Sequence, residues 1–292
     1  MAKNRRDNKK KRRNNKSRNT RRKKQGAFQG KVKWMILLFV AAGLIYFVVP
    51  RSSSPPAPVL SPQMIERFPH DTTAFTQGLL IENGRLYEST GQNGASSLRR
   101  VDLATGEVEM IHVLDSIYFG EGLAALDGKL FQLTWKKRVG FVYDLETFEP
   151  LDTLTIPTRE GWGLTEDGQH LILSDGSAHL RYLDPQTFDV VREVEVRDAG
   201  MPVPRLNELE YVDGLIYANV WQNSNIAVID PADGRVLGWL NLNWLNVMHS
   251  PIDGADVLNG IAYDPDKKRL YLTGKLWPLL YAFQVPAIER QE

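Results

Sequence analysis

A short motif repeats five times along the chain, and this repetition constrains the fold more than any other feature. The copies are Phe75-Thr76-Gln77-Gly78-Leu79, Phe119-Gly120-Glu121-Gly122-Leu123, Glu160-Gly161-Trp162-Gly163-Leu164, Leu206-Asn207-Glu208-Leu209-Glu210 and Leu258-Asn259-Gly260-Ile261-Ala262. Aligned on Leu79, Leu123, Leu164, Leu209 and Ile261, they are separated by 44, 41, 45 and 52 residues. A period of about 40–50 residues indicates a repeat array.

Each copy opens a series of short apolar stretches that are broken by turn sequences. In four copies an Asn-Gly or Asp-Gly pair follows the first stretch: Asn83-Gly84, Asp127-Gly128, Asp167-Gly168 and Asp213-Gly214. Such pairs predict tight hairpins, because both residue types tolerate positive φ. In the fifth copy the longer sequence 264–268 takes this place. Helical periodicity is absent after residue 50, so we expect four antiparallel strands per unit and no helix.

Repeated units of four antiparallel strands predict an all-β fold, a five-bladed β-propeller. Five blades of about 45 residues need about 225 residues, and residues 63–286 supply 224. The fifth unit ends after its third strand. We therefore predict that residues 63–68 (QMIERF) provide its outer strand and close the ring.

Charge divides the chain into two parts. Residues 1–33 hold 16 Lys and Arg against Asp7 alone, a net of +15, whereas the remainder holds 20 Lys and Arg against 34 Asp and Glu, a net of −14. The basic part has too little apolar content to bury a core, so we predict a disordered cytoplasmic tail. Residues 34–49 (WMILLFVAAGLIYFVV) carry no charge, and residues 50–62 are rich in Pro and Ser. We predict a transmembrane signal anchor at 34–49 and a semi-extended linker at 50–62.

The basic tail also predicts the orientation of this single-pass membrane protein. Lys and Arg stay on the cytoplasmic side, which places the propeller in the periplasm or another extracytoplasmic space. A cleaved signal peptide is the alternative, but its basic region would be 33 residues long and no small-x-small site precedes Pro50. We expect the tail to contact anionic lipid rather than nucleic acid, and we expect a monomer.

Two sets of residues are expected at one mouth of the ring. The loop that leads into each innermost strand and the turn that leaves each second strand open at the same end. The first set is Phe75, Gln77, Glu121, Trp162, Asn207, Glu208 and Asn259, and the second is Glu88, Trp135, Asp175, Trp221, Gln222, Lys275 and Trp277. Four are tryptophans, and aromatic residues with a few polar groups are typical of concave ligand sites.

Glu121 is the strongest candidate for a chemical role, because it lies between two glycines in an apolar stretch. Lys275 is the second candidate, with a structural pairing to Glu88 or Glu208 as the alternative. Asn207 and Gln77 have the alternative role of holding loop backbone.

Other polar residues are interpreted structurally. We expect Glu208, Glu210 and Asp175 to form hydrogen bonds between blades. The five histidines lack metal-ligand spacing and the chain has no cysteine, so we expect no catalytic zinc and no cofactor. A structural ion in the channel stays an open question.

Ten sequence matches, five of which overlap copies of the repeated motif, occur in the order found in one known family. They are Phe75–Leu79, Leu86–Gly91, Phe119–Gly122, Gln132–Lys136, Glu160–Thr165, Ser174–Gly176, Leu206–Tyr211, Ala218–Trp221, Leu258–Tyr263 and Thr273–Pro278. Over residues 63–285 the chain resembles the plant-type, papaya-like glutaminyl-peptide cyclotransferases, which also occur in bacteria. The resemblance implies a five-bladed propeller, distinct from the fold of the zinc-dependent animal enzymes.

The resemblance also implies an activity and a site. The family converts an N-terminal glutamine of a peptide or protein into pyroglutamate and releases ammonia, as a metal-independent acyltransferase of the aminoacyl class. Glu121 would be the proton shuttle, and the pocket would consist of Phe75, Gln77, Trp135, Trp162, Asn207, Trp221 and Lys275. We further expect Lys275, with Asn207 or Gln77, to stabilise the oxyanion. The alternative is a non-catalytic propeller that binds peptides or cell-envelope components at the same mouth.

Overall fold

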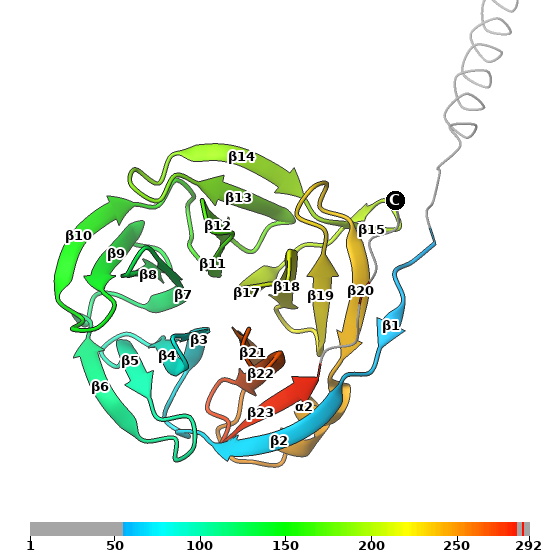
Figure 1. Ribbon diagram of the computed structural model, residues 1–292, viewed down its shortest axis with the longest axis horizontal. Coiled ribbons are helices and arrows are strands. Elements are labelled where there is room, and N and C mark those ends of the chain that lie inside the picture. Colours follow the sequence, from blue (N-terminus) through cyan, green and yellow to red (C-terminus); the bar gives the residue numbers. More distant parts are fainter. Residues whose placement is uncertain (1–54, 285–287, 289–292) are drawn as a thin grey trace, which may run out of the picture. The chain divides into compact units, whose positions relative to one another are not determined.

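The structure, a computed structural model, describes residues 55–284 and residue 288. It confirms the predicted five-bladed β-propeller, with five sheets arranged around one axis (Figure 1). The predicted tail (1–33), membrane anchor (34–49) and first part of the linker (50–54) lie outside the described residues. Within the described part of the chain, no helix combines the length and apolar character that a membrane crossing requires.

Each blade is a four-stranded antiparallel sheet whose first strand is innermost. Blade one contains β3 (Thr76–Glu82), β4 (Arg85–Thr90), β5 (Ser97–Val101) and β6 (Val108–Val113). Blade two contains β7 (Gly120–Leu126), β8 (Lys129–Thr134), β9 (Val139–Asp144) and β10 (Pro150–Thr155). Blade three contains β11 (Leu164–Glu166), β12 (Leu171–Ser174), β13 (His179–Leu183) and β14 (Val190–Glu195). Blade four contains β17 (Leu206–Val212), β18 (Leu215–Val220), β19 (Asn225–Ile229) and β20 (Val236–Asn241).

Blade five is assembled from both ends of the propeller. Its inner strands are β21 (Leu258–Asp264), β22 (Arg269–Gly274) and β23 (Leu279–Gln284), and its outer strand is β2 (Gln63–Pro69). β2 pairs antiparallel with β23, with Gln63 opposite Gln284 and Pro69 opposite Leu279. This confirms the prediction that the segment before blade one closes the ring.

Tight turns between the first and second strands follow the predicted chemistry in three blades. Asn83-Gly84, Asp127-Gly128 and Asp213-Gly214 all have positive φ at both residues, as a two-residue type I′ turn requires. In blade three only Gly168 has positive φ. Asp167 instead accepts hydrogen bonds from the backbone N–H groups of Gln169 and His170, which stabilises a longer loop.

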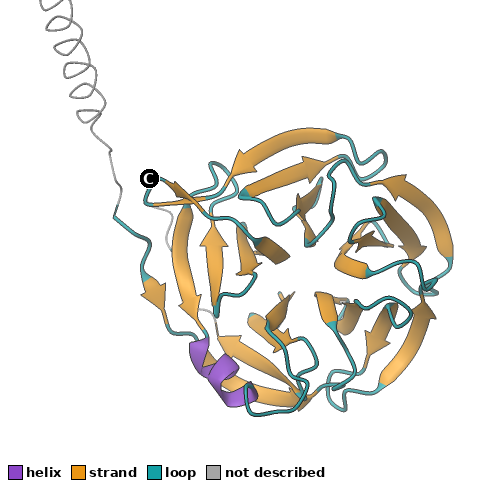
Figure 2. Cartoon of the chain, turned by 180° about the vertical axis from the view of Figure 1, so that it is seen from behind, coloured by secondary structure: helices purple, strands orange, loops and turns teal. Residues whose placement is uncertain are grey.

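The expectation that no helix follows residue 50 is wrong. α2 (Asn243–His249) lies at the periphery of the ring between blades four and five (Figure 2). Its insertion accounts for the longest repeat separation, 52 residues. The helix has only seven residues, of which Leu245 and His249 are buried, and so short a segment gives no periodic signal over the usual window.

Three short strands were also not predicted. β1 (Val59–Leu60), within the predicted linker, pairs parallel with β20 and adds a fifth strand to the sheet of blade four. β15 (Arg197–Asp198) and β16 (Met201–Pro202) form a two-stranded sheet in the connection between blades three and four. Strands of two residues carry too little alternation to be recognised in a sequence.

The apolar core is divided into five clusters, one at each interface between neighbouring blades. Successive residues of a strand point to opposite faces, so each innermost strand serves two interfaces. Leu79 packs with Ala262 of blade five, whereas Leu80 packs with Leu123 of blade two. The alternating pattern therefore joins the blades into one ring.

Buried carboxylates add hydrogen bonds between the innermost strands. From β17, Glu208 accepts the backbone N–H of Leu79 in β3 at 3.2 Å and that of Ile261 in β21 at 2.8 Å. Glu210 accepts the N–H of Tyr263 at 2.8 Å. The predicted inter-blade role is thus confirmed for both residues. Asp175 bonds within blade three instead, to Arg181 at 2.7 Å and to Ser177.

Glu208→Ala should destabilise the ring, because it leaves two buried backbone N–H groups without an acceptor. The expected loss in the free energy of unfolding is about 1–3 kcal/mol for each amide, measured by chemical denaturation. Glu193→Ala on the exposed strand β14 is the control and should cost less than about 1 kcal/mol. Equal stability of the two variants would show that Glu208 does not hold the three strands together.

Candidate active site at the mouth of the propeller

The repeated motif places a β-bulge in four of the five innermost strands. The register against the second strand shifts at Gln77 in β3, at Glu121 in β7, at Asn207 in β17 and at Asn259 in β21. A bulge leaves a residue unpaired and re-aims its side chain. In blade three the innermost strand begins only after Trp162. The motif therefore places one variable side chain per blade at the same level of the ring.

Glycines in the motif allow the innermost strands to touch. A Cβ on Gly122 would lie 2.4 Å from the backbone nitrogen of Leu164, and one on Gly163 would lie 1.9 Å from the carbonyl oxygen of Asn207. The N–H of Gly122 donates to the carbonyl of Trp162 at 2.7 Å. Backbone contact thus links blades two, three and four directly beside the bulge residues.

Glu121 is a buried acid without a protein partner. The residue is 4% exposed, and its side chain makes no hydrogen bond or ion pair with any residue in the described part of the chain. Burial raises the pKa of Glu121 well above its usual range, and the nearby charge of Glu160 raises it further, while Lys275 opposes both effects. A carboxylate with a raised pKa is a stronger base than a free glutamate, which suits a group that takes up a proton during a reaction.

Lys275 follows β22 and is 5% exposed. Burial lowers the pKa of Lys275, while the charges of Glu121 and Asp256 act in the opposite direction. Its Nζ lies 4.7 Å from the ring centroid of Phe75. The charge of Glu121 thus raises the pKa of Lys275, although the two side chains form no ion pair in the described structure.

The alternative that Lys275 pairs with Glu88 or Glu208 is not what the structure contains. Glu88 accepts hydrogen bonds from His70 at 3.0 Å and from Thr76 at 2.7 Å. Glu208 accepts hydrogen bonds from the two backbone N–H groups described above. Both acids are therefore satisfied without the lysine, which leaves its ammonium group available to a ligand.

An aromatic wall extends from blade one to blade four. Phe75 packs edge to face against Phe119 at 6.0 Å between centroids, and Phe119 lies 5.6 Å from Trp135. Trp162 and Trp221 form a second edge-to-face pair at 5.8 Å. The four aromatic residues predicted for the pocket are thus brought together along the mouth, with Trp221 the most exposed at 38%.

The two predicted amides differ in their surroundings. The side-chain oxygen of Gln77 accepts a hydrogen bond from Asn259 at 3.3 Å, which ties blade one to blade five. Asn207 is 3% exposed, and its side chain makes no hydrogen bond to another described residue. Its backbone carbonyl accepts the Ser174 hydroxyl at 2.7 Å. Asn207 therefore has amide donors to offer a ligand, whereas Gln77 is partly committed to structure.

Trp277 was expected at the mouth, and this prediction is wrong. Its side chain is fully buried and stacks on His249 of α2, with 4.1 Å between ring centroids. Its indole N–H donates to the carbonyl of Asp256 at 2.7 Å. The inserted helix covers Trp277 and makes it part of the apolar core between blades four and five.

Two residues of the wall were missed by the sequence reasoning. Phe119 connects Phe75 to Trp135, and Glu160 accepts the indole N–H groups of both Trp135 and Trp162. A signal for Phe119 was present, because it occupies the same motif position as Phe75. Glu160 opens the third motif copy, so its nearness to Trp162 was also visible.

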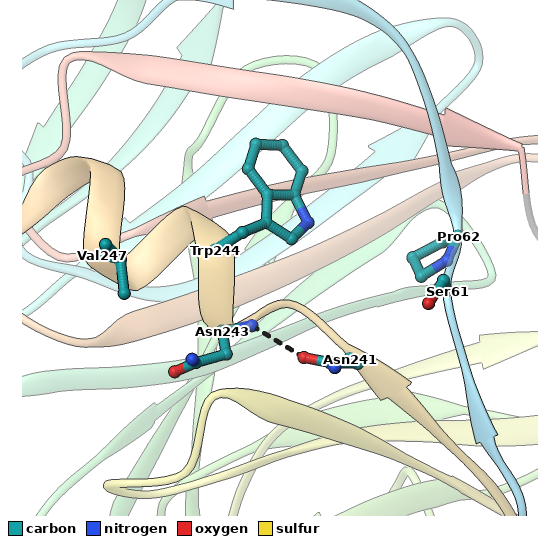
Figure 3. Close-up of a pocket in the computed structure, with 6 residues that line it drawn as sticks. All are labelled: Ser61, Pro62, Asn241, Asn243, Trp244 and Val247. Carbon is teal, nitrogen blue, oxygen red and sulfur yellow. Dashed lines mark hydrogen bonds between the residues drawn. The ribbon is translucent and has the colours of Figure 1, made fainter.

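A groove elsewhere on the propeller has no member of this site. It has a volume of about 430 Å³ and lies between α2 and the segment before β2 (Figure 3). Its lining consists of Ser61, Pro62, Asn241, Asn243, Trp244 and Val247. No group of three or more His, Asp or Glu residues with the spacing to hold a metal ion occurs in the described residues.

Fold and site together define a β-propeller with a buried acid and base beside an aromatic wall at one mouth. A sequence model of the glutamine cyclotransferase family matches residues 38–285, and the chain belongs to this family. It is 48% identical over 226 residues to a glutaminyl-peptide cyclotransferase of Arabidopsis thaliana, which covers 76% of this chain and 71% of the relative. The crystal structure of a glutaminyl cyclase from Myxococcus xanthus superimposes with a TM-score of 0.74 at 35% identity, covering 81% of this chain and 100% of that one.

Proposed function

We propose that this protein is a glutaminyl-peptide cyclotransferase, which converts the N-terminal glutamine of a peptide or protein into pyroglutamate and releases ammonia. The family and its two relatives support this activity. The single observation that carries the mechanism is the buried, unpaired carboxyl group of Glu121, which is within the electrostatic influence of the buried Lys275. Neither group has a structural task in the described part of the chain that would explain its burial.

Glu121 is the proposed proton shuttle. The reaction forms a bond between the α-amine nitrogen and the γ-carboxamide carbon, and it breaks the bond from that carbon to the amide nitrogen. The amine must lose a proton and the departing nitrogen must gain one. A single carboxylate close to both nitrogens can take the first proton and deliver the second. The raised pKa of Glu121 makes the carboxylate a stronger base than in water.

Lys275 and Asn207 are the proposed partners of the developing oxyanion. When the amine attacks, the carboxamide oxygen gains negative charge, and donors aimed at it in a dry site lower the barrier. Lys275 offers three N–H donors and Asn207 offers two. Both side chains are buried and are not used by other described residues, so they need no reorganisation to serve the intermediate.

The aromatic wall is the proposed binding surface for the substrate. The faces of Phe75, Trp135, Trp162 and Trp221 can contact the glutamine side chain and attract the positive N-terminus of the peptide. They also exclude water, which favours cyclisation over hydrolysis. Gln77 completes the polar side of the pocket through its amide.

We further propose that the reaction is of the aminoacyl-transfer type and needs no metal, because Glu121 and Lys275 can supply both the proton transfer and the charge stabilisation. The charge pattern of residues 1–49 supports a membrane-anchored protein with its propeller outside the cytoplasm. Peptides and proteins with an N-terminal glutamine are the proposed substrates. The competing hypothesis, a non-catalytic propeller, would use the same mouth only to bind.

Replacing Glu121 by Gln should abolish most of the activity while leaving the fold intact. Gln has the same shape but cannot carry the proton, so kcat should fall by roughly 10²- to 10⁴-fold. Ammonia release from a Gln-initiated peptide measures the rate, and Glu193→Gln on exposed strand β14 is the charge-matched control. Retention of near-normal kcat by folded Glu121→Gln would exclude the proton-shuttle role.

Replacing Lys275 by Ala separates binding from catalysis. If the ammonium group stabilises the oxyanion, kcat and kcat/KM should fall together, by on the order of 10²-fold. Steady-state kinetics over a range of peptide concentrations provides both constants. A rise in KM with unchanged kcat would mean that Lys275 only binds the substrate.

A further inference from the structure

One oxygen atom of Glu160 links two tryptophans that come from neighbouring blades. Its Oε2 accepts the indole N–H of Trp135 at 2.8 Å and that of Trp162 at 3.1 Å. Trp135 follows β8 in blade two, whereas Trp162 precedes β11 in blade three. An indole has a single N–H donor and no acceptor, so this carboxylate sets the rotation of both rings at once.

Lys136 contacts both the ring of Trp135 and the carboxylate of Glu160. Its Nζ lies 3.5 Å from the centroid of the Trp135 ring and 3.9 Å from Oε1 of Glu160. Trp135 is therefore held at its edge by a carboxylate and at its face by an ammonium group. The Glu160 side chain is 26% exposed and that of Lys136 is 56% exposed, so neither is needed to fill the apolar core.

Glu160 is also electrically coupled to Glu121. The charged groups that act on Glu121 are Lys275, which favours its ionised form, and Glu160, which opposes it. These two come from the turn after β22 and the loop before β11, on different sides of the mouth. A neutral hydrogen-bond acceptor at position 160 would hold the indoles but would lack this effect.

We propose that Glu160 is a positioning residue for the cyclisation: its carboxylate holds Trp135 and Trp162 in the orientation that receives the substrate. The inference rests on the proposed function and assigns a role to a side chain outside the pocket predicted from the sequence. Glu160 takes no part in proton transfer itself. The hydrogen bonding of Glu160 can be separated from its charge by substitution, because glutamine keeps the acceptor and removes the charge.

Two variants of the full chain separate these effects. Glu160→Gln keeps an acceptor but removes the charge, so the acid limb of the kcat/KM profile, where Glu121 must be deprotonated, should move to lower pH. Glu160→Ala removes both, so the limb should move likewise, while kcat/KM on the plateau should fall by about 10- to 10²-fold. Glu193→Gln, which removes a charge from the exposed outer strand of blade three, should leave the profile unchanged.

Indole resonances provide a readout that does not depend on turnover. With ¹⁵N-tryptophan in the full chain, the Trp135 and Trp162 signals, assigned from Trp135→Phe and Trp162→Phe, should shift in Glu160→Ala more than the signal of Trp277. If the wild-type protein releases no ammonia, the proposed function fails. Independently of activity, unshifted indole signals would refute the proposal that Glu160 holds Trp135 and Trp162. In an active enzyme, an unmoved acid limb in a folded Glu160→Gln variant would refute the electrostatic role. Loss of stability without any change in the kinetic profile or indole signals would reduce Glu160 to a structural residue.

Discussion

Backbone contact between the innermost strands is the constraint on which the rest of the structure depends. At Gly122 and Gly163 neighbouring blades approach so closely that a Cβ would collide with the next strand. The bulges beside these glycines direct Glu121 and Asn207 out of the sheets at the same level. Four bulged strands and the loop before β11 can therefore carry different side chains to one place, which is how a structural repeat becomes an asymmetric site.

The buried acids of the interior differ in whether other groups of the protein hydrogen-bond to them, and this difference points to function. Burial alone would raise the pKa of Glu88, but its bonds with His70, together with Arg99 and Thr76, hold that pKa below its usual value. Burial raises the pKa of Glu121, as it does for Glu208 and Glu210, but Glu121 accepts no hydrogen bond from a described residue, whereas those two do. The ring thus satisfies an acid that serves structure and leaves unsatisfied one that is proposed to move a proton. Unpaired buried charge is costly, so its persistence at a mouth is typical of an active site.

Much of the fold could be predicted because short, local sequence patterns specify the blades of the propeller. The motif period, the Asn-Gly and Asp-Gly turns and the spare segment before blade one together predict five blades and the closing role of β2. α2 and β1 were missed because segments of seven and two residues carry no detectable period. Trp277 was misplaced because its burial depends on that inserted helix, and Glu160 was overlooked because its bond to Trp135 joins two blades. Contacts between distant segments leave no pattern in either segment alone, and the catalytic roles assigned to the mouth stay predictions.

The most direct test of the account is whether the wild-type chain, after treatment with EDTA, converts a Gln-initiated peptide into its pyroglutamyl form with one ammonia released per peptide. Mass spectrometry of the peptide and an ammonia assay would be combined, with an Asn-initiated peptide as the control substrate. The account predicts equal turnover before and after EDTA, because the proton transfer and charge stabilisation come from Glu121 and Lys275. Loss of turnover on chelation and recovery with added metal would contradict the metal-free mechanism. Peptide binding without any ammonia release would contradict the proposed activity itself.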